Sequence, residues 1–130
     1  MKRKLAIALA VALLSCIAAS ASAAVPYTAV LENTYGSIIS DTTSRAGCLF
    51  GRLYITSNSS NMYCHFYLTY NGEQVTNVYN DKLTAGRWMY YNEYIPKDAI
   101  ITLNGRCDSS ISSATITGSF GAGCAANGGW

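Results

Sequence analysis

Charged residues and histidine are scarce in this sequence of 130 residues. Only 12% of the residues are charged, and the chain has a single His. Nucleic-acid binding needs clustered Lys and Arg against the phosphate backbone, so the low charge excludes a nucleic-acid partner. One imidazole without any C-x-x-C pair gives no metal-binding motif. We therefore expect no metal, no cofactor and no nucleic acid.

The one long apolar run stands at the N-terminus. Residues 2–4 are basic, residues 5–14 are apolar, and small residues lead to Ala21-Ser22-Ala23, an A-x-A cleavage pattern. This order predicts a signal peptide at 1–23. Its removal takes three of the nine basic residues and leaves six against seven acidic residues, a formal net charge of −1. The remaining sequence has no uncharged apolar run long enough for a membrane-spanning helix.

A signal peptide implies export, and we expect a secreted or periplasmic protein after cleavage near Ala23. The alternative is a lipoprotein anchored at Cys16. Leu13-Leu14-Ser15-Cys16 is similar to a bacterial lipoprotein signal, in which the Cys is acylated and becomes the first residue. The apolar run continues past Cys16, however, and this favours ordinary cleavage.

Four cysteines follow the signal: Cys48, Cys64, Cys107 and Cys124. An even number in a small exported chain predicts two disulfides. Sequential pairing would join Cys48 to Cys64 and Cys107 to Cys124, whereas nested pairing would join Cys64 to Cys107 and Cys48 to Cys124. Strand alternation points Cys64 and Cys107 inward, which suits nested pairing, but Cys48 falls on the wrong face unless a bulge at Gly51 shifts the phase. The pairing therefore stays open.

Tyr, Thr, Ile and Val dominate the rest of the chain, and Gly, Asn, Asp and Ser interrupt them at short intervals. This composition is typical of strands joined by turns. Asn71-Gly72 is the strongest hairpin signal, because both residues tolerate positive φ, and 84–86 is a second expected turn. We predict strands at 27–32, 36–40, 48–56, 62–70, 74–79, 87–95, 100–107 and 111–120.

Seven or eight short strands with frequent turns predict an all-β fold. The expected architecture is a small disulfide-stapled antiparallel β-sandwich over 24–120, with a small β-barrel as the alternative. In the strand at 48–56, Leu49, Leu53 and Ile55 are expected to face the core. Residues 121–130 are rich in Gly and would form a C-terminal tail tethered by Cys124.

Aromatic side chains give the strongest functional signal, because all ten Tyr follow residue 23. Alternate positions in the strands at 62–70 and 87–95 each carry a row of three side chains on an outward face. Exposed Tyr and Trp give a large, rigid contact area with a polar edge, which is typical of binding surfaces. The alternative interpretation is that Tyr pairs only stabilise the sheets. The predicted ligand-binding residues are Tyr63, His65, Tyr67, Trp88, Tyr90 and Tyr94.

Two further patterns accompany these rows. Arg52 and Tyr54 are expected on the strand next to the row that contains Tyr63. A stripe of hydroxyl groups alternates along 111–120, and we interpret it as the solvent face of an amphipathic strand. Its members are Ser113, Thr115, Thr117 and Ser119.

Tyr63-x-His65-x-Tyr67-x-x-Tyr70-x-Gly72 is similar to the strand that carries the first catalytic His of small, secreted, guanine-specific ribonucleases. The resemblance covers ten residues and implies acid–base chemistry at His65. That family also uses a second His, a Glu and an Arg, and it packs a helix beside the sheet. A missing second His removes a proton-transfer partner commonly worth about 10²–10⁴-fold in rate, so a ribonuclease is the remote alternative. No motif places the other candidates, which are Glu73, Glu93, Arg87 and Arg106.

These patterns predict a small secreted binding protein without enzymatic activity, which recognises a glycan or a protein partner through its Tyr and Trp rows. Two different functions are also compatible with the same patterns. One is a membrane-active toxin or antimicrobial protein whose aromatic rows lie at a membrane surface. The second is a secreted or periplasmic hydrolase inhibitor, whose exposed binding loop would be 57–61 or 108–110.

Overall fold

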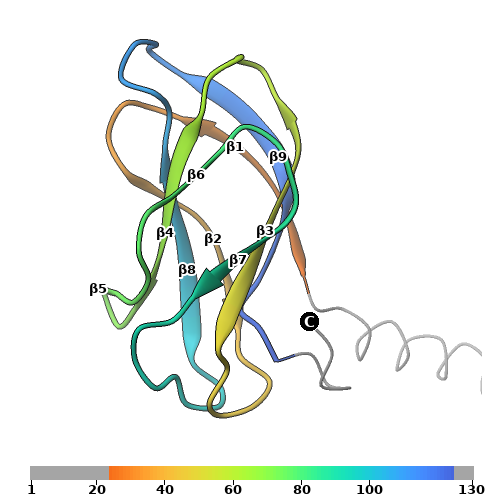
Figure 1. Ribbon diagram of the computed structural model, residues 1–130, viewed down its shortest axis with the longest axis vertical. Coiled ribbons are helices and arrows are strands. Elements are labelled where there is room, and N and C mark those ends of the chain that lie inside the picture. The colour runs from red at the N-terminus through yellow and green to blue at the C-terminus, as the bar shows by residue number, and fades with distance from the viewer. Residues whose placement is uncertain (1–23, 125–130) are drawn as a thin grey trace, which may run out of the picture.

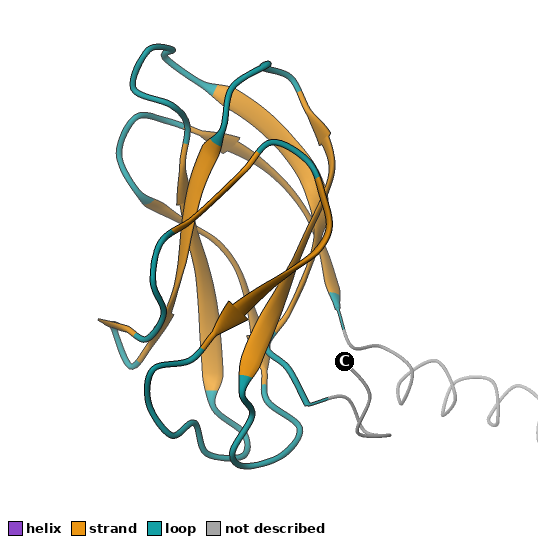
Figure 2. Cartoon of the chain, viewed as in Figure 1, coloured by secondary structure: helices purple, strands orange, loops and turns teal. Residues whose placement is uncertain are grey.

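The computed structural model describes residues 24–124, and its regular elements are all strands (Figures 1 and 2). Within these residues there is accordingly no helix long and apolar enough to cross a membrane. The predicted signal peptide at 1–23 and residues 125–130 of the predicted tail lie outside the described residues. The strands are β1 (Val25–Leu31), β2 (Gly36–Thr42), β3 (Phe50–Asn58), β4 (Cys64–Tyr70), β5 (Glu73–Gln74), β6 (Tyr79–Asp81), β7 (Thr84–Tyr90), β8 (Ile100–Arg106) and β9 (Ala114–Gly121).

Two antiparallel sheets form the two layers of the molecule (Figure 1). The first sheet has the strand order β1-β9-β3-β7. The second has the order β2-β8-β4, and the short strands β5 and β6 both pair with β4. Except between β4 and β6, each successive long strand crosses to the other sheet, which is the jelly-roll arrangement of two Greek keys. The predicted antiparallel β-sandwich is confirmed.

The core lies between the sheets and is built from alternate residues of each strand. In β4, Cys64, Phe66 and Leu68 have no exposed surface, whereas the residues between them are half-exposed. Leu53 and Ile55 of β3 are buried in the opposite sheet, as predicted. Burying a large apolar side chain of this kind contributes roughly 1.5–3 kcal/mol to folding. The predicted inward phase of β4 is therefore confirmed.

The segment predicted as one strand at 74–79 instead forms β5 and the start of β6, separated by residues 75–78. Val75 and Thr76 are adjacent and both buried, which strand alternation does not allow. The N–H of Val75 donates to the carbonyl of Leu68. The hydroxyl of Thr76 accepts from the N–H of Leu68 and donates to the carbonyl of Asn77. This hydroxyl replaces a ladder hydrogen bond and so interrupts the strand.

The predicted turn at 84–86 is wrong, because these residues begin β7. The register between β3 and β7 shifts after Leu53 and leaves Gly86 as the extra residue of a bulge. Gly86 has φ +137°, a conformation that residues with a Cβ atom rarely adopt. A Cβ atom there would also meet the guanidinium of Arg52. Gly86 therefore both permits the bulge and leaves room for Arg52.

The start of β3 differs from the prediction in a way that affects Cys48. The strand begins after Leu49, so strand alternation does not apply to Cys48 in the loop before it. Leu49 is 72% exposed, and its predicted inward position is wrong. Gly51 faces the core without a bulge, and a Cβ atom there would lie 2.8 Å from Cδ1 of Leu68 in the opposite sheet. A side chain at position 51 would therefore have to displace Leu68.

Loops gather at the two ends of the sandwich (Figure 2). We call one the disulfide end, which holds the loops 43–49 and 91–99. We call the other the thiol end, which holds the loops 59–63 and 107–113. Each is named for the cysteines that lie there. The predicted hairpin turn is confirmed, since Asn71 and Gly72 both have positive φ between β4 and β5.

Candidate functional site

Three aromatic rings form a cluster on the outer face of the first sheet. Phe50 of β3 pairs with Tyr90 of β7, and Trp88 is the next outward residue of β7. Phe50 and Trp88 stack with their ring centroids 4.9 Å apart and their planes 8° from parallel. Tyr90 meets both rings edge-on. Trp88 is 44% exposed and Tyr90 50%, so this aromatic cluster of Phe50, Trp88 and Tyr90 presents ring surface to solvent in a fixed arrangement.

Arg52 and Tyr54 extend the aromatic cluster along β3. Arg52 pairs with Trp88 in register, and its guanidinium carbon lies 5.8 Å from the centroid of that ring. It also lies 5.3 Å from the ring centroid of Tyr54. Exposed cation–π contacts contribute about 0.5–1 kcal/mol each. The expectation that Arg52 and Tyr54 adjoin the row of Tyr63 is wrong, because β3 belongs to the other sheet from β4.

The hydroxyl stripe continues the same outer face. β9 lies between β3 and β1, and its Ser119 pairs with Tyr54. Thr117 is the next outward residue, and its hydroxyl lies 3.3 Å from that of Thr28 on β1 in a hydrogen bond. Ser113 precedes β9. The outer face of the first sheet therefore changes from aromatic rings on β7 and β3 to hydroxyl groups on β9 and β1.

Tyr94 does not join the aromatic cluster. β7 ends at Tyr90, and Tyr94 lies 69% exposed in the loop 91–99. Its ring lies beside Gly47 at the disulfide end. Tyr91 makes the last pairing contacts of this chain segment, with its N–H donating to the carbonyl of Leu49 and an isolated bridge to Thr76. Residues 92–99 form no strand, so alternation does not set the direction of their side chains.

The second predicted row lies on the outer face of the second sheet. His65 and Tyr67 are half-exposed on β4, and Tyr63, which is 54% exposed, precedes that strand. Tyr67 meets the ring of Tyr35 edge-on at 4.8 Å. The ammonium of Lys82 lies 4.9 Å from the ring centroid of Tyr63. The two predicted rows therefore occupy opposite faces of the sandwich and do not form one site.

The surroundings of His65 differ from those of a ribonuclease site. Its Nδ1 donates to the side-chain carbonyl of Asn80, its neighbour on β6, and its partner on β8 is Arg106. Arg87, the other candidate for the catalytic Arg of a ribonuclease, donates two hydrogen bonds, 2.8 and 2.9 Å long, to the carboxylate of Asp81. These bonds raise the pKa of Arg87. Across residues 24–124, no helix lies beside a sheet and no three His, Cys, Asp or Glu side chains gather at a metal site.

A small pocket opens between the edge strands β1 and β2. Its volume is about 210 Å³, and Val30, Glu32, Tyr35 and Ile38 are among the residues that line it. Pockets for drug-sized ligands usually enclose about 300–1,000 Å³. This pocket therefore has room for a small chemical group, and none of the six predicted binding residues lines it.

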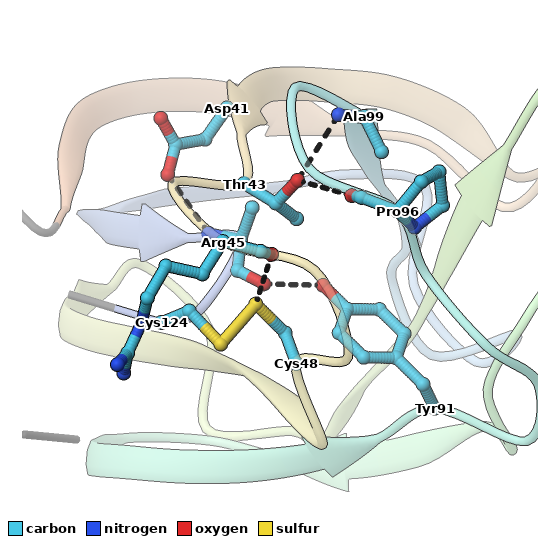
Figure 3. Close-up of a disulfide and its surroundings, with 9 residues drawn as sticks. Asp41, Thr43, Arg45, Cys48, Tyr91, Pro96, Ala99 and Cys124 are labelled. Carbon is cyan, nitrogen blue, oxygen red and sulfur yellow. Dashed lines mark hydrogen bonds between the residues drawn. A yellow bond between two sulfur atoms is a disulfide. The ribbon is translucent and has the colours of Figure 1, made fainter. Parts of the chain in front are cut away.

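Cys48 and Cys124 form a disulfide at the disulfide end, with their Cα atoms 5.5 Å apart (Figure 3). The bond ties the loop 43–49 to the chain just after β9, and it shows that sequential pairing is wrong. Cys64 and Cys107 are buried thiols. The structure thus contains one of the two bonds of the nested pairing. A disulfide indicates an oxidising environment, either extracellular or periplasmic.

No protein-family model, curated protein sequence or solved structure matches this chain. A jelly-roll arrangement alone assigns no function, because one fold supports many unrelated activities. The functional argument therefore depends on the surfaces of the two sheets.

Proposed function

We propose that this is a small secreted protein that binds a glycan through the outer face of its first sheet, without catalysis. The observation that carries the proposal is the exposed aromatic cluster of Phe50, Trp88 and Tyr90, with Arg52 beside it. Aromatic rings on a sheet give a rigid contact area that loses little side-chain entropy when a ligand binds.

The mixture of groups on this face favours a glycan over other ligands. A sugar ring has apolar C–H faces that stack on aromatic rings and hydroxyl groups that hydrogen-bond at its edge. The first sheet offers rings on β7 and β3, a guanidinium at Arg52, and hydroxyl groups on Ser119 and Thr117 of β9. An extended saccharide lying across the strands would meet both kinds of group.

Export is supported by two independent features. The sequence at 1–23 has the order of a signal peptide, and the disulfide between Cys48 and Cys124 needs an oxidising compartment. An exported protein encounters glycans of cell walls and cell surfaces. Its own charge is low, so contact by stacking and hydrogen bonding suits it better than electrostatic attraction.

Binding to insoluble polysaccharides tests the proposal. The natively exported protein is mixed with cellulose, chitin, xylan or peptidoglycan, and the protein left in solution is measured. We expect saturable depletion by at least one of these probes. Trp88→Ala should weaken that binding about 30-fold, because removing a central aromatic anchor costs about 2 kcal/mol.

Tyr63→Ala is the matched control, because Tyr63 is also an exposed aromatic residue, at 54% against 44% for Trp88, but lies on the other outer face. It should bind the polysaccharide as the unchanged protein does. Equal losses for Trp88→Ala and Tyr63→Ala, or no depletion by any of the four probes, would contradict the proposal. Dye release from phospholipid vesicles in place of polysaccharide binding would support a membrane-active protein instead.

A further inference from the structure

Cys64 and Cys107 lie opposite each other at the thiol end. The antiparallel strands β4 and β8 pair His65 with Arg106 and Phe66 with Gly105. One further step along the same register sets Cys64 against Cys107. Both side chains have no exposed surface. The two thiols that the disulfide end does not use are therefore cross-strand neighbours within the core.

The hydrogen bonds show which kind of cross-strand pair this is. The N–H of Cys107 donates to the carbonyl of Glu32 at 2.8 Å, on the side away from β4. Since the N–H and C=O of one strand residue point to the same side, Cys107 makes no ladder bond to Cys64. In such non-hydrogen-bonded pairs the Cα atoms lie about 4.5 Å apart and the side chains approach closely. Disulfides span Cα separations of about 4.4–6.8 Å.

The two thiols also share the same environment. Burial raises the pKa of the Cys64 thiol, and the nearness of Cys107 raises it further. The Sγ of Cys107 donates to the side-chain carbonyl of Asn33 at 3.1 Å, and the Sγ of Cys64 accepts a long contact from Asn58. These are weak, local contacts. A rotation of the two side chains toward each other would replace these contacts.

We propose that Cys64 and Cys107 are a second disulfide site, which closes by thiol–disulfide exchange as the exported chain folds. One cysteine attacks a low-molecular-weight or protein disulfide, forming a mixed disulfide and releasing one thiol. The other cysteine then displaces the second thiol and forms the Cys64–Cys107 bond. Two electrons pass to the oxidant, whose disulfide becomes two thiols, and the two cysteine protons end on them.

Burial sets the time at which this reaction takes place. Both sulfur atoms are enclosed once the sheets pack, so no oxidant reaches them in the folded protein. Oxidation therefore precedes or accompanies closure of the core. A chain folded under reducing conditions keeps both thiols, whereas a chain folded after export closes the bond. The proposal depends on export but not on the ligand of the aromatic cluster.

The bond would brace the two loops of the thiol end. Cys64 directly follows the loop 59–63, and Cys107 begins the loop 107–113. The start of the loop 59–63 already contacts β9 just after the loop 107–113, since the N–H of Ser59 donates to the carbonyl of Thr115 and the N–H of Thr115 donates to the hydroxyl of Ser59. A disulfide between Cys64 and Cys107 would join the two loops at their other ends.

Thiol labelling of the natively exported protein tests the proposal. The protein is unfolded in guanidinium without reductant, treated with iodoacetamide and digested for peptide mass analysis. We expect no carbamidomethyl group on Cys64 or Cys107 and a cross-linked peptide that contains both. The Cys48→Ala/Cys124→Ala variant should retain this cross-link, because the two bonds lie at opposite ends. Carbamidomethylation of both Cys64 and Cys107, or their pairing with other cysteines, would overturn the proposal.

Thermal unfolding gives a second measurement that needs no labelling. In the Cys48→Ala/Cys124→Ala variant, the Cys64–Cys107 bond is the remaining disulfide of the described region. Unfolding and refolding with reductant should therefore lower its Tm by on the order of 10 °C relative to the exported form. An unchanged Tm would contradict a closed bond in the exported form.

Discussion

The two ends of the sandwich are closed by different means. At the disulfide end, the Cys48–Cys124 bond joins a loop to the segment that follows the last strand (Figure 3). Ala122 of this segment is held on both backbone groups: its N–H donates to the carboxylate of Asp41, and its carbonyl accepts from the hydroxyl of Tyr91. Thr43 ties the same region to the loop 91–99.

The thiol end is held by side-chain hydrogen bonds in the structure. The amide of Asn58 donates to the carbonyls of Met62 and Lys82, and its own carbonyl accepts from the N–H and hydroxyl of Ser60. Its loops are anchored by strands on both sides. In the structure, a covalent bond together with hydrogen bonds therefore closes one end, and hydrogen bonds close the other.

Loss of the Cys48–Cys124 bond should have the largest effect on stability. The bond spans 76 residues, so its removal frees a long loop in the unfolded state and should cost about 4 kcal/mol. Urea unfolding of the Cys48→Ala/Cys124→Ala variant, compared with the unchanged protein, measures this loss. A loss below that of the single substitution Thr43→Val would show that the disulfide end does not depend on its covalent tie.

Thr43→Val should have the next largest effect. Thr43 is 1% exposed, and its hydroxyl donates to the carbonyl of Pro96 at 2.7 Å and accepts from the N–H of Ala99 at 3.0 Å. Valine keeps the shape but leaves both groups without this partner, which should cost about 2 kcal/mol. Thr43→Ser keeps the hydroxyl and is the control. Equal urea midpoints for Thr43→Val and the unchanged protein would contradict this role.

Patterns in the sequence correctly predicted features that depend on neighbouring residues, namely the direction of side chains along a strand and the position of a tight turn. Alternation correctly placed Cys64, Leu53 and Ile55 in the core, and Asn71-Gly72 correctly marked a hairpin, because both signals act between near neighbours. The sheet to which each strand belongs is a long-range property, so Arg52 was paired with the wrong row and Phe50 was missed. Phe50 alternates with Arg52 and Tyr54 along β3, and this alternation was the available signal.

Two errors arose from local features that a strand pattern does not reveal. The hydroxyl of Thr76 replaced a backbone acceptor and interrupted the predicted strand. Gly86 forms a β-bulge, although Gly in a sequence more often marks a turn. Cys48 lies in a loop whose path is set by its contacts, so alternation could not predict its pairing. The residues that share one surface are set by which strands pair in each sheet, and alternation within one strand does not predict this. The two predicted rows accordingly lie on opposite faces of the sandwich.

Asn58→Ala should have a smaller effect than Thr43→Val. Each residue makes several hydrogen bonds at its own end of the sandwich. Asn58 is half-buried, however, so water can reach the carbonyls of Met62 and Lys82 when its amide is removed. We expect a loss of about 1 kcal/mol in urea unfolding. Asn58→Asp keeps the oxygen that accepts from Ser60 but removes the N–H groups that donate to Met62 and Lys82. It therefore measures the accepted bonds separately from the donated bonds. A loss as large as that of Thr43→Val would show that the thiol end is as tightly closed as the other.

Tyr91→Phe should have an effect near neutral pH no larger than that of Asn58→Ala, because it removes one hydrogen bond, from the hydroxyl to the carbonyl of Ala122, worth about 1 kcal/mol. Its effect should then change with pH. Burial raises the pKa of Tyr91 above the ordinary value of 10.0, and the charge of Asp41 raises it further. The folded state therefore keeps a proton that the unfolded state loses.

The sign of this linkage sets the expected pH profile. The stabilising contribution of the Tyr91 proton is complete below pH 10 and declines as the pH rises above it, because the unfolded chain then ionises first. Between about pH 8 and about pH 11, the unchanged protein should lose about 1 kcal/mol more stability than Tyr91→Phe. Urea unfolding at both pH values measures the difference.

Tyr27→Phe is the matched control, since burial also raises the pKa of Tyr27 but its hydroxyl donates to Tyr54, away from Ala122. It should show the same relief at high pH. Parallel stability losses in Tyr91→Phe and the unchanged protein would mean that the Tyr91 hydroxyl is open to water and does not hold Ala122.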